Sequence, residues 1–147
     1  MAKHETQEIL EGRLRSAQLK VTAPRVAVLA VLTGRGHLDA DSVFSNIVTS
    51  LPKTSVQAVY GVLAALVTAG LVRKIEPAGS SALYEARVGD NHHHVVCLNC
   101  KSVEDVDCVI GASPCLTPSN VNGFAIQSAE ITFWGLCSKC QLGIDAP

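Results

Sequence analysis

Residues 55–70 read SVQAVYGVLAALVTAG, and LVRKIE follows directly at residues 71–76. Ser55 is a favoured helix cap and Gly70 a favoured helix stop, so a helix is predicted between them. Its apolar side chains recur at helical spacing; they are Val56, Val59, Tyr60, Leu63, Leu66 and Val67. Two β-prone runs, 71–76 and 82–86, flank the turn-forming residues 77–80. This stretch therefore predicts a helix followed by a two-stranded hairpin.

Three further helices are predicted upstream of this stretch. The first covers residues 5–17, the second begins near Pro24 and stops at Gly34 and Gly36, and the third covers residues 39–49. Proline suits the first turn of a helix because its missing N–H is not needed there. Three or four short helices followed by a two-stranded wing are typical of a winged helix-turn-helix domain.

The remainder of the chain has a different pattern. Gly89-Asp90-Asn91 marks a boundary, which predicts domains at 1–88 and 89–147. Short strands are predicted at 92–97, 102–107 and 124–134, whereas prolines break any helix in 111–122. The predicted fold class is therefore α+β, with a helical first domain and a smaller, strand-containing second domain.

Composition excludes several classes of protein. Hydrophobic residues make up 48 % of the 147, which excludes wholesale disorder. The longest apolar run, Val26–Leu32, is too short to span a bilayer, and the polar N-terminus lacks a signal-peptide core. We therefore expect a cytoplasmic protein without a membrane partner, in which cysteines are thiols or metal ligands.

Charge is distributed unevenly along the chain. Residues 1–76 carry nine Lys and Arg against six Asp and Glu, a balance of +3. Residues 77–147 carry three against seven, a balance of −4. The basic first half gives a weak indication of a polyanionic partner.

Four cysteines form two pairs with metal-ligand spacing. Cys97 and Cys100 make the first CxxC, and Cys137 and Cys140 make the second, with 36 residues between the pairs. Four thiolates match a closed, tetrahedral zinc site, which would be structural because it leaves no position for water. Two disulfides or a redox-active CxxC are the alternatives, and both fit a reducing compartment less well.

A histidine triplet offers a second set of metal ligands. On a strand, His92 and His94 share one face and His93 takes the other. Carboxylates lie nearby in the sequence, at Glu85, Glu104, Asp105 and Asp107. Nitrogen and oxygen ligands suit Fe(II), Mn(II), Zn(II), Co(II) or Ni(II), and the spacing does not choose among them. A polar, solvated strand is the alternative.

Several residues of the first half suit DNA recognition. Gln57 can read adenine, and Tyr60 can contact a phosphate or a thymine methyl group, unless it packs in the core. Lys20, Arg25 and Lys53 could bind phosphates, or simply form a solvated face. The remaining cysteines, Cys108 and Cys115, are interpreted as inert thiols, with a redox role as the alternative.

Together these residues resemble the ferric uptake regulator (Fur) family of bacterial metal-dependent repressors. The resemblance follows the family's order over nearly the whole chain, in segments 19–25, 36–41, 56–60, 69–72, 92–100 and 134–140. The stretch at 88–97, with Asp105-Val-Asp-Cys108, is similar to the actinobacterial FurA branch, close to the peroxide-sensing PerR type.

The resemblance implies an N-terminal winged helix, a C-terminal α/β dimerisation domain, and a homodimer that binds palindromic, A/T-rich operators when metallated. By position, the four CxxC cysteines match the structural zinc ligands. The regulatory metal ligands would be His37, Glu85, His92, His94 and Asp105. The DNA-binding residues expected are Lys20, Arg25, Ser55, Gln57 and Tyr60. One Fe(II), or Mn(II) or Zn(II) in vitro, bonded to both domains would set the spacing of the recognition helices.

Two departures from the family bear on function. Gly61 stands where many members have Arg, which removes a guanidinium contact with DNA. Ala129, followed by Glu130, stands where many iron-type members have a His of a further metal site. The Glu85 and Asp105 pair combines the carboxylates typical of iron-type and peroxide-type members.

The sequence thus favours a peroxide-responsive, iron-dependent repressor that is not an enzyme and has no small-molecule substrate. An iron-availability regulator without peroxide sensing is the first alternative. A metallohydrolase using the His and Asp residues is the second, although it lacks a positioned general acid or nucleophile. A thiol switch built on Cys108 and Cys115 is the third.

Overall fold

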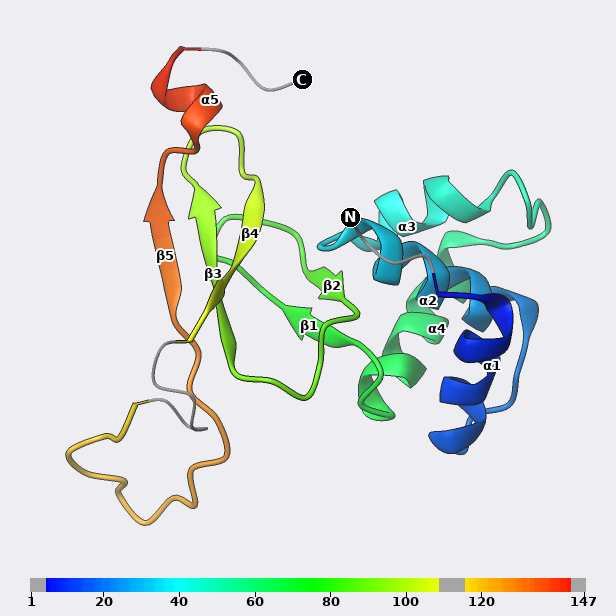
Figure 1. Cartoon of the computed structure of the whole chain (residues 1–147), viewed down its shortest axis with the longest axis horizontal. Helices are drawn as coiled ribbons and strands as arrows, with labels where there is room; N and C mark the ends of the chain where they lie inside the picture. Colours follow the sequence, from blue (N-terminus) through cyan, green and yellow to red (C-terminus); the bar gives the residue numbers. More distant parts are fainter. Residues whose placement is uncertain (1–4, 109–115, 144–147) are drawn as a thin grey trace. The chain divides into compact units, whose positions relative to one another are not determined.

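The computed structural model describes residues 5–108 and 116–143, and the chain divides into two compact units, Met1–Val88 and Gly89–Pro147. The first unit contains four helices and a hairpin (Figure 1). They are α1 (Gln7–Ser16), α2 (Ala23–Arg35), α3 (Ala40–Ile47), α4 (Val56–Thr68), β1 (Arg73–Ile75) and β2 (Leu83–Glu85). This is the predicted order of a winged helix-turn-helix, and the α+β fold class is confirmed.

Short polar side chains begin three of these helices. Thr22, Asp39 and Ser55 each accept a hydrogen bond from the backbone N–H three residues later, at the starts of α2, α3 and α4. These bonds satisfy N–H groups that have no partner within the helix. The caps explain why the predicted helix starts lie within a residue or two of the observed ones.

The core of the first unit is almost purely aliphatic. Its fully buried aliphatic side chains come from all four helices, and they are Leu14, Val28, Leu29, Leu32, Val43, Ile47, Val59, Leu63 and Leu66. Tyr60 was predicted to belong to the apolar stripe of α4, but it is 51 % exposed and does not belong to the buried face. The alternative in which Tyr60 packs in the core is therefore wrong.

The wing is an antiparallel pair in which Arg73 lies opposite Glu85 and Ile75 opposite Leu83. A bridge between Leu38 and Tyr84 ties β2 to the segment after α2, with backbone hydrogen bonds of 3.1 and 2.8 Å. Gly36 ends α2 with φ 78°, a conformation that glycine adopts at little cost. The turn and the bridge place His37 beside the end of β2.

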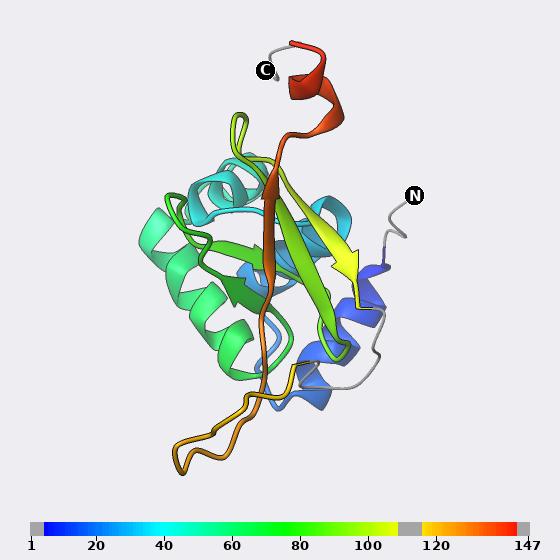
Figure 2. The same ribbon diagram turned by 90° about the vertical axis from the view of Figure 1, so that its left-hand side faces the viewer.

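The second unit is built on a three-stranded sheet of order β4-β3-β5 (Figure 2). Its elements are β3 (His92–Cys97), β4 (Val103–Asp107), β5 (Thr132–Gly135) and the short α5 (Ser138–Gln141). The central strand β3 pairs antiparallel with β4 and parallel with β5. All residues of β3 except Val95 are buried, so both faces of the strand are covered. This explains why its sequence shows no alternation between apolar and polar residues.

One strand prediction was wrong in extent. The strand predicted at 124–134 is present only as Thr132–Gly135, because only these residues have a ladder partner, in β3. Within the described part of the chain, residues 124–131 form no ladder with another strand, although the Ile131 carbonyl accepts a hydrogen bond of 3.3 Å from the His94 N–H, and most of their side chains are exposed. Cys115 lies outside the described residues. Within 5–108 and 116–143, no helix has both the length and the apolar character needed to cross a membrane.

Candidate metal centres and nucleic-acid interface

The four CxxC cysteines converge in the second unit. Cys97 ends β3, Cys100 closes the turn after it, and Cys137 and Cys140 flank and occupy α5. The turn is held by a hydrogen bond from the Lys101 N–H to the Cys97 carbonyl, 3.0 Å. The four sulfur atoms all lie within 4.8 Å of one another. The predicted four-cysteine cluster is therefore present.

The geometry of this cluster fits zinc. Zn–S bonds of about 2.3 Å in a tetrahedron require sulfur–sulfur separations of about 3.8 Å. The sulfurs of Cys100 and Cys137 are 3.7 Å apart. A disulfide would require about 2.05 Å, and all four cysteines are free. The arrangement matches four thiolates around one ion and does not match two disulfides.

The pKa values of the cysteines also favour a bound cation in this cluster. The backbone N–H of Cys137 donates to the Cys97 sulfur at 3.4 Å and is the main cause that lowers the pKa of Cys97 to about 6. The Asn99 amide lowers the pKa of Cys140, but burial and the three neighbouring thiols outweigh it and raise that pKa to about 11. With a pKa of about 11 the Cys140 thiol keeps its proton near neutral pH, whereas a divalent ion would stabilise the thiolate.

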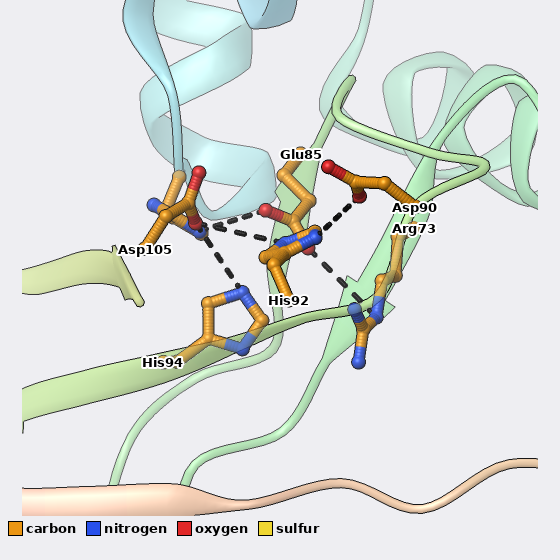
Figure 3. A network of polar contacts seen from close by, with 7 residues as sticks. Arg73, Glu85, Asp90, His92, His94 and Asp105 are labelled. Atoms are coloured by element: carbon orange, nitrogen blue, oxygen red, sulfur yellow. Dashed lines mark hydrogen bonds and ion pairs between the residues drawn. The ribbon is translucent and has the colours of Figure 1, made fainter. Parts of the chain in front are cut away.

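A second group of predicted ligands lies on one face of the β3–β4 pair. His94 lies opposite Asp105 in the register, and its Nε2 is 3.6 Å from Asp105 Oδ1. Nε2 of His92 is 3.7 Å from the same oxygen. Figure 3 shows both imidazoles beside the Asp105 carboxylate, and their ring centroids are 5.0 Å apart. Strand alternation thus brings three of the predicted ligands of this unit together.

Asp90 supports this group, and sequence reasoning did not identify it. Its Oδ1 lies 2.7 Å from Nδ1 of His92. A carboxylate on one ring nitrogen fixes the tautomer and leaves the other nitrogen, Nε2, available to a metal. The available signal was an acidic residue two positions before the first histidine of the triplet.

The first unit holds the other two predicted ligands. Nε2 of His37 lies 2.8 Å from Oε2 of Glu85, whose side chain is only 2 % exposed. The Leu38–Tyr84 bridge positions both residues, since each is adjacent to one bridge partner. The other oxygen of Glu85, Oε1, lies 3.8 Å from Nε of Arg73, a residue that sequence reasoning also missed (Figure 3).

The other nearby polar residues are placed differently. His93 is buried on the opposite face of β3, as strand alternation predicts, and lies opposite Val106. Glu104 is exposed on β4, opposite Val95, on the face that Asp105 does not occupy. Asp107 lies opposite His92 in the register. Cys108, just after β4, does not belong to the four-sulfur cluster.

The residues predicted to contact DNA gather around the start of α4. Gln57 and Tyr60 are both exposed there, and the Ser55 hydroxyl accepts a hydrogen bond of 3.1 Å from the Ala58 N–H. Ser55 therefore has a role as a helix cap. Gly61 lies on the same exposed side of the helix, and a Cβ added there would meet no atom within 4 Å.

The start of α2 borders the same surface. A hollow of about 470 Å³ is lined by Pro24 of α2, the α3–α4 turn with Lys53, and Ala58 of α4. Arg25 donates to the Lys20 carbonyl at 2.7 Å, which holds its guanidinium near the loop before α2. Lys53 thus lines the same hollow as Ala58 of α4, and Arg25 directly follows Pro24 of that hollow in the sequence.

Comparison with known proteins agrees with this arrangement. The family model for the Ferric uptake regulator family matches residues 16–134. The transcriptional regulator FurA of Mycobacterium tuberculosis is 54 % identical over 130 residues, which cover 88 % of each chain.

Solved structures share the fold. The Helicobacter pylori ferric uptake regulator has a TM-score of 0.71 at 23 % identity, covering 96 % of this chain and 97 % of that one. A zinc uptake regulator solved with zinc and DNA has a TM-score of 0.67 at 20 % identity, covering 95 % and 98 %. With the family match over most of its length, the chain belongs to the ferric uptake regulator family of transcriptional regulators.

Proposed function

We propose that this protein is a metal-dependent transcriptional repressor that binds operator DNA as a homodimer when Fe(II) occupies its regulatory site. The observation that carries the proposal is the preassembly of two ligand groups, His37 with Glu85 and the two histidines of β3 with Asp105. Neither group is needed for a winged helix or a sheet to fold, so a ligand best explains them. The family membership and the 54 % identity with a transcriptional regulator support the same function.

The four-cysteine cluster would hold a structural Zn(II). All four positions of a tetrahedral ion are taken by Cys97, Cys100, Cys137 and Cys140, so none remains for a substrate. The cluster ties the end of β3 to α5 across 36 intervening residues. Its binding free energy would therefore contribute directly to the folding of the second unit.

The regulatory ion would be held by His37, Glu85, His92, His94 and Asp105. Imidazole and carboxylate donors suit Fe(II), and Mn(II) or Zn(II) would occupy the site in vitro. Because the ligands come from both units, the bound state would restrict their relative orientation. Repression then requires only that the DNA-binding orientation binds metal more tightly than the others.

The DNA contact would be made by α4 in a major groove. Gln57 can hydrogen-bond adenine, and the exposed Tyr60 can reach a phosphate or a thymine methyl group. Lys20, Arg25 and Lys53 would contact phosphates on either side. The helix α4 carries no charged side chain, so base recognition by this helix is restricted to neutral groups.

The homodimer is supported by the unequal edges of the second unit's sheet. The β4 edge strand contains Glu104, Asp105 and Asp107, charges that discourage pairing with another chain. The β5 edge has no such charge, and Phe133 and Trp134 are 48 % and 42 % exposed. Exposed apolar side chains beside an open strand edge favour association of two copies.

Peroxide sensing follows from the same ligands. Fe(II), if bound by these residues, would activate hydrogen peroxide for a two-electron oxidation of one of its ligands. Transfer of one oxygen atom from peroxide to the imidazole of His37 or His92, with release of water, would impair that ligand and release the DNA.

A cytoplasmic location follows from a repressor function.

The proposal is tested by DNA selection from a random-sequence pool, with the zinc-containing protein and anaerobic Fe(II), Mn(II) or no added metal. We expect a specific duplex to be retained only with metal. Peroxide should abolish binding of the Fe(II) form, add oxygen to His37 or His92 by mass spectrometry, and leave the Mn(II) form bound.

Other outcomes separate the alternatives. Persistent Fe(II)-dependent binding after peroxide would indicate an iron-availability regulator. A peroxide response of the Mn(II) form with unmodified histidines would move the sensor to Cys108 or Cys115. Failure to retain any duplex would contradict the repressor function and favour the metallohydrolase alternative.

A further inference from the structure

We infer that Arg73 lowers the affinity of the regulatory site for divalent metal. The same side chain stabilises the protein when the metal is absent. The inference rests on the proposed function, because it takes Glu85 as a ligand of that site. Loss of Arg73, a residue of the first unit, should lower the stability of the metal-free protein and raise its affinity for metal.

The first step is the environment of Glu85. Its side chain is 2 % exposed, and burial of a carboxylate is costly unless a positive charge or hydrogen-bond donors compensate. The strand register places Arg73 directly opposite Glu85, on the neighbouring strand of the wing. Nε of Arg73 lies 3.8 Å from Oε1 of Glu85, so the guanidinium contributes a compensating positive charge (Figure 3).

The second step is the division of the carboxylate between two partners. Oε1 faces Arg73, whereas Oε2 lies 2.8 Å from Nε2 of His37. A metal that uses Glu85 would share this carboxylate with a permanent cation, because arginine does not lose its proton in proteins. The negative charge that Glu85 offers to the metal is thereby partly neutralised.

The third step is the consequence for sensing. A sensor must release its metal when the concentration falls, so maximal affinity is not an advantage. When the metal leaves, Arg73 still compensates the buried carboxylate, and the first unit keeps its fold. Arg73 is thus a residue that acts on the metal through Glu85 rather than a ligand.

The test is substitution of Arg73 by Gln, with Mn(II) affinity of the zinc-containing protein measured by the electron paramagnetic resonance signal of free Mn(II). Loss of the competing charge should tighten Mn(II) binding, on the order of tenfold. In the absence of Mn(II), the same variant should unfold at a lower temperature, by roughly 5 °C. Arg73→Lys, which keeps the charge, should restore both values toward wild type.

The matched control is Lys74→Gln, the next residue of β1. Lys74 is exposed and pairs with Glu76 at 3.1 Å, so its loss removes the same net charge without touching Glu85. We expect little change in Mn(II) affinity. An equal tightening in Lys74→Gln would overturn the inference, since it would show a general effect of net charge.

A purely structural role of Arg73 would give another result. Arg73→Gln would then lower both the melting temperature and the Mn(II) affinity, which also overturns the inference. The variant Glu85→Gln distinguishes a wrong role for Arg73 from failure of the proposed function. If Glu85→Gln stays folded, keeps its zinc and binds Mn(II) as tightly as wild type, Glu85 is not a ligand and the proposed site is wrong.

Discussion

At the scale of single residues, the contact between Asp90 and Nδ1 of His92 leaves Nε2 as the ring nitrogen that the proposed metal would use. Asp90→Asn removes the charge that fixes the tautomer and that makes the ring more basic. We expect Mn(II) affinity to fall on the order of tenfold, with the fold and the zinc retained. Glu104→Gln is the control, since it removes a carboxylate from the other face of β4. Equal Mn(II) affinity of Asp90→Asn and wild type would show that Asp90 does not orient the ligand.

The zinc cluster gives a second prediction at this scale. Cys137→Ser removes one thiolate from a closed site and with it binding free energy that contributes to folding. We expect loss of zinc and a monomeric or aggregated protein, measured by metal analysis and gel filtration. Cys108→Ser should keep both zinc and dimer, because Cys108 lies outside the cluster. A zinc-free Cys137→Ser dimer of normal stability would count against the assignment.

Sequence reasoning identified the proposed metal ligands but not Arg73 and Asp90, which contact two of them. Each CxxC pair and the His92 and His94 alternation are local patterns, so the geometry within each follows from spacing. The meeting of the two CxxC pairs also needs the pairing of β3 with β5. Arg73 and Asp90 act through a cross-strand neighbour and a turn, and no spacing rule specifies such contacts. The pairing of His37 with Glu85 depends on the Leu38–Tyr84 bridge between segments 46 residues apart.

At the scale of elements, α4 carries the prediction for DNA specificity. Gln57→Ala should relax the preference at one base pair, at a cost of about 1–3 kcal/mol for the preferred base. Thr68→Ala, exposed at the other end of the helix, should not change the preference. Lys20→Ala should weaken binding to all duplexes alike and reduce the salt dependence. An unchanged preference in Gln57→Ala, measured by competition between duplexes, would place base recognition elsewhere.

The β5 edge carries the prediction for assembly. Phe133→Lys puts a charge on an exposed, apolar edge strand and should shift the protein toward monomer, measured by analytical ultracentrifugation. Glu104→Lys, on the acidic β4 edge, should leave the dimer intact. If both variants sediment as wild type, the dimer does not form through β5.

Helices were easier to predict than strands in this chain, for a physical reason. The caps at Thr22, Asp39 and Ser55 and the apolar spacing are local, and together they determine where a helix begins and which face is buried. A strand exists only where another strand pairs with it. The β-prone residues 124–131 therefore remain without a ladder among the described residues, although their sequence resembles that of a strand.

At the scale of the whole molecule, the central claim is that metal bound by residues of both units controls DNA binding. His37 and His93 should therefore behave differently when substituted. His37 is a proposed ligand from the first unit, whereas His93 faces away from the proposed ligands of β3. The two substitutions remove the same chemical group. Only the loss of His37 should uncouple the metal from the DNA.

The most direct measurement is fluorescence anisotropy of the selected duplex, titrated with wild-type, His37→Ala and His93→Ala protein, with and without Mn(II). We expect Mn(II) to increase the affinity of the wild type strongly. We expect the same increase for His93→Ala, and no increase for a His37→Ala dimer that still contains zinc. A His37→Ala protein with the wild-type response to Mn(II) would show that metal bound through His37 does not control DNA binding.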